Sequence, residues 1–152
     1  MKEFAGGPQY TLTGQVMVTL PPEEAFSLFT PRGEELWVRG WEPRFPLPVD
    51  DDTVPGTVFE TRAHDETTIW VVIDREEGRR VSYARVTPGK RAGTVTVTVL
   101  ANGRGGSTAE VTYRLTALSP EGERELNEFA DEYQDFLKSW EEAIAEYGAN
   151  RS

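Results

Sequence analysis

Arg85 is the residue whose chemistry depends most on its surroundings. It lies in an alternating stretch, and a turn centred on residues 77–78 would pair Trp70 with Arg85 and Val72 with Tyr83. Because those side chains are largely apolar, the guanidinium needs a carboxylate partner or an anionic ligand group. Asp74 and Glu60 are candidate partners, so the residues leave open whether Arg85 forms a structural ion pair or anchors a ligand.

The opposite face of the same two strands is also apolar. We expect the face with the larger side chains to line a cavity, because such side chains would shape a pocket. The other face then needs a different cover, and a homodimer interface is the simplest candidate. It carries Ile69, Val71, Ile73, Ala84 and Val86.

Three carboxylates flank two tryptophans at positions 37 and 41: they are Glu34, Glu35 and Glu42. A carboxyl group of raised pKa could act there as an acid or base, although acidic residues on a helix surface are far commoner. His64 and Asp65 fall in a polar turn, where we expect both at the surface. The glycine-rich residues 103–106 lie in a hairpin and lack the strand-to-helix context of a phosphate loop.

Composition excludes several kinds of site. The chain has 152 residues, one histidine and no cysteine. Disulfides, zinc-thiolate sites and cysteine nucleophiles are therefore excluded, and we expect no metal and no cofactor. No apolar run approaches the roughly 20 residues of a membrane span, and residues 1–8 lack the apolar core of a signal peptide. We predict one cytoplasmic domain over residues 1–152, without stable membrane insertion.

The net charge of −10 is concentrated near the C-terminus. Residues 119–149 hold ten acidic residues against Arg124 and Lys138. Such a face would repel nucleic acid and anionic membranes. The acidic residues are interpreted as the solvated side of an amphipathic helix, with an acidic docking surface as the alternative.

The elements that would position these residues follow from periodicity and turn residues. A loose tail over 1–9 precedes a strand over 10–20, and Pro22 and Pro31 then begin two short helices, the second reaching about Trp37. A meander of five strands follows, over 56–63, 66–75, 79–87, 92–101 and 107–118.

The last predicted element is a long helix over 119–148. Apolar residues recur there at steps of three and four, Ser119 and Pro120 suit its start, and Gly148 suits its end. An antiparallel sheet with one apolar face needs a cover, and this stripe is the only large one left. The order β-α-α-β-β-β-β-β-α therefore predicts an α+β fold with a curved antiparallel sheet of about six strands around the C-terminal helix.

This layout, together with several stretches of the sequence, resembles the SRPBCC superfamily, which includes START lipid-transfer domains, the birch-pollen allergen family and polyketide cyclase/dehydrase-like proteins. The stretches are LFTPRGEELW (28–37), GWEP (40–43), IWVV (69–72), YARVTPG (83–89) and YRLTALSPEG (113–122). The resemblance runs from about Gln9 to Tyr147 and implies the helix-grip fold. That superfamily shares a cavity rather than a catalytic motif.

The resemblance implies a cavity lined by the concave sheet face, the short-helix region and the inner stripe of the last helix. We expect ten residues to line it: Trp37, Trp41 and Phe45 at the mouth; Phe59, Trp70, Tyr83 and Arg85 on strands; and Tyr133, Phe136 and Trp140 on the helix. Buried Trp and Tyr tips want polar partners, which suits a semi-polar pocket. Ordinary core packing is the alternative for each aromatic residue.

The expected function is binding of a small hydrophobic or aromatic molecule in this cavity. One alternative is an enzyme resembling polyketide cyclases or dehydratases, in which Arg85, a tyrosine and a carboxylate would act on a polyketone. Another is a protein-interaction domain, like the co-chaperones or toxin components among superfamily members. A binding module needs a closed apolar cavity, whereas an enzyme needs several convergent polar groups.

Overall fold

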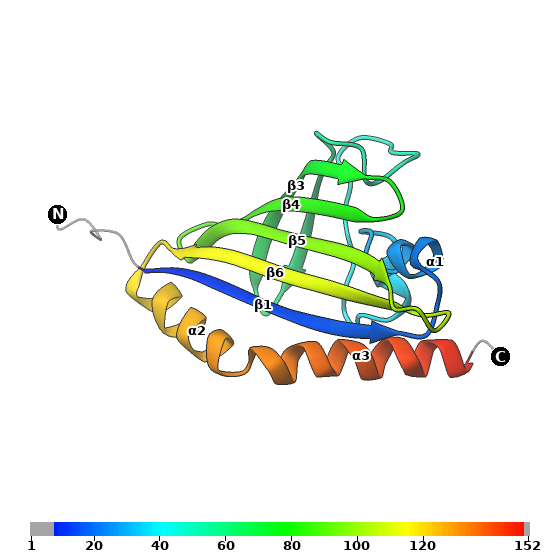
Figure 1. Cartoon of the computed structure of the whole chain (residues 1–152). Helices are drawn as coiled ribbons and strands as arrows, with labels where there is room; N and C mark the ends of the chain where they lie inside the picture. Colours follow the sequence, from blue (N-terminus) through cyan, green and yellow to red (C-terminus); the bar gives the residue numbers. More distant parts are fainter. Residues whose placement is uncertain (1–7, 151–152) are drawn as a thin grey trace, which may run out of the picture.

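The computed structural model describes residues 8–150. Their strands form one six-stranded antiparallel sheet with strand order β1-β6-β5-β4-β3-β2. The sheet curls over a C-terminal helical arm, so the predicted α+β fold is confirmed (Figure 1). The elements are β1 (Gln9–Val18), α1 (Pro22–Ser27), the 3-10 helix η1 (Gly33–Leu36), β2 (Val58–Ala63), β3 (Glu66–Glu76), β4 (Arg80–Thr87), β5 (Arg91–Ala101), β6 (Ser107–Ala117), α2 (Pro120–Asp131) and α3 (Tyr133–Asn150).

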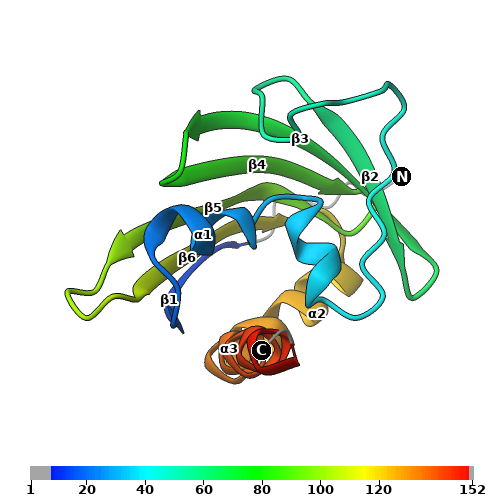
Figure 2. The ribbon, with the colours of Figure 1, turned by 90° about the vertical axis from the view of Figure 1, so that its right-hand side faces the viewer.

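The helical arm covers only part of the concave face. Viewed along α3, the helix lies beneath β1 and β6, and the segment between α1 and β2 descends beside β2 on the other side (Figure 2). The interior therefore lies between three elements, namely the sheet, α3 and this connecting segment.

The hairpin register predicted for β3 and β4 is confirmed, since Trp70 pairs with Arg85 and Val72 with Tyr83. The turn differs from the predicted one, because Glu76 pairs with Arg80 and leaves a three-residue loop. A bulge between Val72 and Asp74 shifts the register by one residue, so that the pairs further from the turn are the predicted ones. The Trp70 and Tyr83 side chains are buried on the concave side. The opposite face keeps Ile69, Ile73 and Val86 exposed.

Several predicted boundaries differ from those of the structure. The C-terminal helix is broken at Glu132, whose φ of −103° and ψ of 8° leave helical geometry, and α3 continues through Gly148 to Asn150. The break keeps Phe129 of α2 against Tyr113 of β6, with ring centroids 5.2 Å apart, while α3 follows β1.

At the other end of the chain, β1 ends at Val18, because Ser107 at the start of β6 is its last partner. The second short helix is the single turn η1, in which Thr30 Oγ1 accepts from Gly33 N at 3.0 Å. Gln9 was expected in a loose tail but pairs with Thr116, and the rest of that tail, up to residue 7, lies outside the described residues.

A close approach fixes α3 against β1. A Cβ on Gly14 would lie 2.4 Å from Leu137 Cδ1, so only glycine leaves room for that side chain. The Tyr133 hydroxyl donates to the Val111 carbonyl at 2.7 Å, and Met17 N on the sheet edge donates to Glu141 Oε2 at 2.9 Å. Buried Leu137 and hydrogen bonds at its two sides thus set the helix position.

Gly93 is a second close approach, where β5 passes between Arg85 and Leu115. A Cβ there would lie 1.9 Å from the Arg114 carbonyl oxygen. We expect Gly93→Ala to lower the free energy of unfolding by about 1–3 kcal/mol, because backbone must move to admit the methyl group. Urea denaturation measures this. Gly148→Ala is the control: nothing lies within 4 Å of its added Cβ, and it should be neutral or stabilising. Equal effects of the two substitutions would contradict the prediction.

Candidate functional site

A cavity of about 310 Å³, called here the inner cavity, opens between the sheet, α3 and the segment after η1. Four aromatic side chains form its walls: Trp41, Trp70, Phe136 and Trp140. Four arginines, two glutamates and a histidine also line it: Arg39, Arg62, Arg85, Arg91, Glu34, Glu66 and His64. The remaining lining residues are Val38, Gly40, Thr61, Ala63, Thr68 and Tyr113.

The two tryptophans on the sheet side have their polar tips satisfied. Trp41 Nε1 donates to the Pro31 carbonyl at 2.7 Å, and Trp70 Nε1 donates to Thr61 Oγ1 at 3.0 Å. Their rings meet edge to face with centroids 5.5 Å apart. Because the indole N–H groups are occupied, these residues offer the cavity mainly their apolar rings.

Arg85 is the arginine of the inner cavity that lies against the Trp70 ring. Its guanidinium carbon lies 4.6 Å from the centroid of the Trp70 ring, and its Nε is buried without a hydrogen-bond partner. Desolvation lowers its pKa from the ordinary value. The predicted ion-pair partners are wrong: Asp74 pairs with Arg80 at 2.8 Å, and Glu60 bridges to Arg44 through the backbone. No carboxylate among residues 8–150 forms an ion pair with Arg85.

Glu34 is half-buried and lines the inner cavity, whereas it was expected on a helix surface. The η1 turn directs it inward, since its backbone N–H donates to the Thr30 carbonyl at 3.0 Å. Burial raises the pKa of its carboxyl group well above 4.5. The side chain lines the inner cavity and a space of about 20 Å³ beside it, close enough to Tyr83 and Tyr113 to raise the pKa of both hydroxyl groups.

Tyr113 is a cavity residue that the sequence analysis missed. It lies on β6, in register with Val95 of β5, which in turn pairs with Tyr83. Burial raises the pKa of its hydroxyl group far above 10.0, and the nearby charge of Arg85 opposes this rise. The signal was available, because Tyr113 shares the buried face of the strand with Val111 and Leu115, and the three alternate with Thr112 and Arg114.

The ten predicted cavity residues divide into two groups. Trp41, Trp70, Arg85, Phe136 and Trp140 line the inner cavity. Five others do not line it, namely Trp37, Phe45, Phe59, Tyr83 and Tyr133.

Phe59 and Tyr83 fill the core beside the cavity, where the adjoining space of about 20 Å³ holds at most a water molecule. The Tyr83 hydroxyl is already used, donating to the Phe29 carbonyl at 3.0 Å. Tyr133 is held by Val111, as described above. Phe45 packs outside on Phe59 with Arg32 over its ring.

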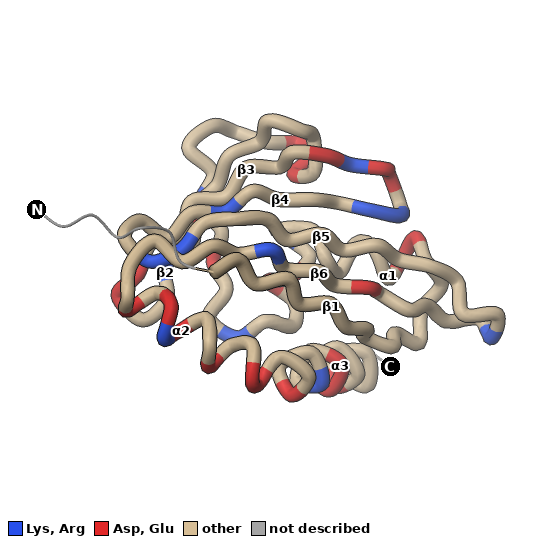
Figure 3. The backbone as a smooth tube through the Cα atoms, turned by 60° about the vertical axis from the view of Figure 1, so that its left-hand side comes forward, with Lys and Arg blue, Asp and Glu red and all other residues tan. Residues whose placement is uncertain are grey.

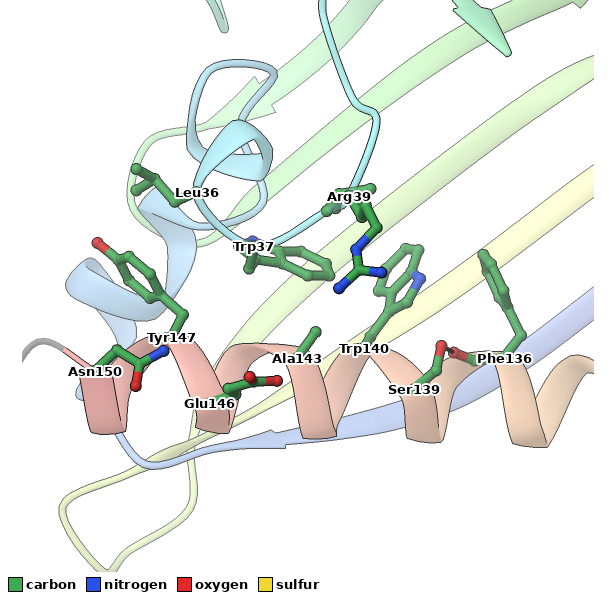
Figure 4. Close-up of a pocket in the computed structure, with 11 residues that line it drawn as sticks. Leu36, Trp37, Arg39, Phe136, Ser139, Trp140, Ala143, Glu146, Tyr147 and Asn150 are labelled. Carbon is green, nitrogen blue, oxygen red and sulfur yellow. Dashed lines mark hydrogen bonds between the residues drawn. The ribbon is translucent and has the colours of Figure 1, made fainter. Parts of the chain in front are cut away.

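Trp37 separates the core from a second hollow, called here the outer groove. Its Nε1 donates to the Leu28 carbonyl at 2.7 Å, and its ring meets Trp140 at 5.4 Å. The outer groove is an open depression of about 660 Å³ along α3. Figure 4 shows the Arg39 side chain pointing toward Trp140 on α3, with Ala143 and Glu146 further along the helix. Val38, Arg39, Phe136 and Trp140 border both hollows.

An ion-pair network closes the cavity near α2. Glu66 of β3 contacts Arg91 at 3.0 Å and Lys90 at 3.4 Å, and the same two cations reach Glu125 at 3.0 and 3.3 Å. Lys90 also contacts Glu121 at 2.7 Å. The network ties α2 to the sheet and already occupies Glu66, the acid nearest to Arg85 on that side.

Two classes of feature are absent from residues 8–150. No group of three or more His, Asp or Glu side chains there could hold a metal ion. No helix in the described part of the chain is long and apolar enough to cross a membrane.

The sequence matches no family model and no curated protein, whereas solved structures match over most of the chain. Protein MLL2253 from Mesorhizobium loti is 17% identical, with a TM-score of 0.67 over 90% of this chain and 98% of that one. Norcoclaurine synthase from Thalictrum flavum, in complex with dopamine and hydroxybenzaldehyde, is 11% identical, with a TM-score of 0.64 over 95% and 89%. The Aha1 dimer from Colwellia psychrerythraea is 13% identical, with a TM-score of 0.62 over 89% and 96%. At these identities the likeness shows the fold.

Replacing Arg85 tests whether it supports the fold. We expect Arg85→Met to leave the free energy of unfolding unchanged or to raise it by up to about 1 kcal/mol, because methionine keeps the packing on Trp70 and removes an unpaired charge. Thermal and urea denaturation measure this. As a control, Arg91→Met should cost about 1 kcal/mol, since it leaves Glu66 and Glu125 with fewer partners. A loss above about 2 kcal/mol for Arg85→Met would mean that Arg85 has a structural partner.

The buried carboxyl group of Glu34 makes stability depend on pH. Between pH 4.5 and its raised folded pKa, the folded protein holds a proton that the unfolded chain releases, so stability falls as pH rises. Glu34→Gln removes this effect. Its stability advantage over the wild type should grow across that window by about 1.4 kcal/mol per unit of pKa elevation. Denaturation at a series of pH values measures this, with the exposed neighbour Glu35→Gln as control. A constant difference would show that Glu34 titrates normally.

Proposed function

We propose that the protein binds a small hydrophobic or aromatic molecule in the inner cavity. The observation that carries this proposal is the aromatic wall itself, in which Trp41, Trp70, Phe136 and Trp140 surround about 310 Å³. That volume lies at the small end of the range for ligand sites, so a molecule of one or two rings is the expected size. The indole N–H groups of Trp41 and Trp70 are already occupied, which leaves faces and edges of rings for ligand contacts.

The fold comparison supports this proposal at the level of architecture. Norcoclaurine synthase, which shares the fold, holds two small aromatic molecules in its solved complex. Membership in the SRPBCC superfamily and a cytoplasmic location are proposed on the same architectural grounds and on the sequence patterns.

A proton-transfer enzyme is the second candidate function, and Glu34 is the observation that favours it. A carboxyl group of raised pKa beside a buried tyrosine and an arginine has the composition of an acid-base site. Loss of turnover in Glu34→Gln with ligand binding retained would distinguish this candidate from a binding protein.

Homodimer formation through the outer face of the sheet stays a prediction. Its support is the exposed apolar set on neighbouring strands, formed by Val58, Ile69, Ile73 and Val86. An interaction domain that uses the acidic helices also stays an alternative.

The binding proposal is tested with 2-naphthalenemethanol, a neutral two-ring probe. We expect a Kd between about 1 µM and 1 mM, as for a ligand of this size. In ¹H–¹⁵N spectra the saturable shifts should centre on Ala63, Thr68 and Tyr113, which line only the inner cavity or its inner neighbour. Ala143 and Glu146 report on the outer groove instead. Saturable shifts confined to the outer groove would contradict the proposal.

A further inference from the structure

The charge around the inner cavity is opposite to that of the chain. The protein carries a net charge of −10, and Figure 3 shows Asp and Glu recurring along α2 and α3. The cavity lining instead contains four arginines against two glutamates. Glu66 and Arg91 pair with each other, and Glu66 also pairs with Lys90, which leaves three arginines against Glu34. The cavity is therefore an electropositive hollow in an acidic protein.

Arg85 is the arginine of this hollow that packs against its aromatic wall. Its Nε is buried without an acceptor, and no ion pair reaches its guanidinium within residues 8–150. The contact with the Trp70 ring is favourable but supplies no acceptor atom. A charge removed from water requires a partner of opposite charge, and the described protein does not provide one.

The other open polar groups of the cavity are also hydrogen-bond donors. No described residue accepts a hydrogen bond from the Tyr113 hydroxyl, and the inner cavity is the space it borders. Glu34 has no ion-pair partner among the described residues. Its raised pKa keeps the carboxyl group protonated above the ordinary range, so it can donate as well. Three donors facing one apolar hollow match a ligand group that accepts several hydrogen bonds.

We propose that the ligand of the inner cavity is an aromatic carboxylate, whose carboxylate group binds Arg85 while its ring packs against Trp70 and Trp140. This proposal rests on the proposed binding function and narrows its ligand class. A guanidinium matches a carboxylate in geometry, because two parallel N–H groups can reach its two oxygens. The aromatic walls account for the ring, and the volume of about 310 Å³ limits it to a small one.

The charge of Glu34 should modulate the affinity. The titratable and charged groups around Glu34 come from the sheet and from the rim of the cavity. On the sheet they are Tyr83 and Arg85 of β4, Arg91 of β5 and Tyr113 of β6, with Asp52 near Tyr83. At the rim they are Arg39, Arg62, His64 and Glu66. When Glu34 ionises, it repels a bound carboxylate. Affinity for the carboxylate should therefore fall as pH rises from 4.5 through the raised pKa of Glu34, and Glu34→Gln should flatten that fall.

The test compares 2-naphthoate with 2-naphthalenemethanol, which share a ring system and differ in charge. Binding is measured by quenching of tryptophan fluorescence and by calorimetry. We expect naphthoate to bind roughly tenfold to a hundredfold tighter, the range of a charge-assisted hydrogen-bonded pair. Arg85→Met should abolish this preference, so that the two probes bind the variant with affinities within about twofold of each other. Arg80→Met, which removes a cation at the distant β3–β4 turn, is the matched control and should keep the preference.

The wild-type protein provides a measurement that needs no variant. The Arg85 Nε–H resonance should shift on adding naphthoate and stay in place with naphthalenemethanol, because only naphthoate brings a negative charge to the guanidinium. If naphthalenemethanol binds in the inner cavity and naphthoate binds no tighter, the carboxylate proposal is overturned and the binding function stands. A preference that survives Arg85→Met also overturns it. If neither probe binds in the cavity, both proposals fail.

Discussion

The close contact between α3 and β1 is the constraint on which the rest of the structure depends. Leu137 fits where Gly14 has no side chain, and the Tyr133 hydroxyl bonds to the Val111 carbonyl. The helix is thereby held at one edge of a strongly curved sheet and cannot cover β2, β3 and β4 equally well. The uncovered half of the concave face is closed by large aromatic rings and by the segment after α1, and the inner cavity is the volume they leave.

That arrangement explains why single side chains serve both the packed core and the wall of the cavity. Trp70, only 8% exposed, is a packing residue on its Phe59 and Tyr83 side and a cavity wall on its Arg85 side. Arg85 and Glu34 have no such dual use, since each is desolvated without a compensating partner in the described protein. Groups of this kind cost folding free energy and are typical of positions maintained for a ligand or a reaction.

The placement of charge follows the same division. Lys90 and Arg91 bind Glu66, Glu121 and Glu125, so the cations nearest to α2 are used to hold that helix on the sheet. Arg85 lies on the neighbouring strand β4, opposite Gly93 of β5, and forms an ion pair with none of these carboxylates. A chain of net negative charge therefore has a cationic inner cavity, while acidic residues recur along α2 and α3 (Figure 3).

Local alternation, turn residues and hairpin geometry were enough to predict the fold class, the order of strands along the chain and the pairing of Trp70 with Arg85. These patterns did not reveal the helix break at Glu132. They also did not separate Phe59 and Tyr133, which are core residues, from Trp140, which is a cavity wall. Only the tertiary structure turned Glu34 inward and left Arg85 without Asp74 or Glu60, since burial and ion pairing depend on contacts between residues far apart in sequence.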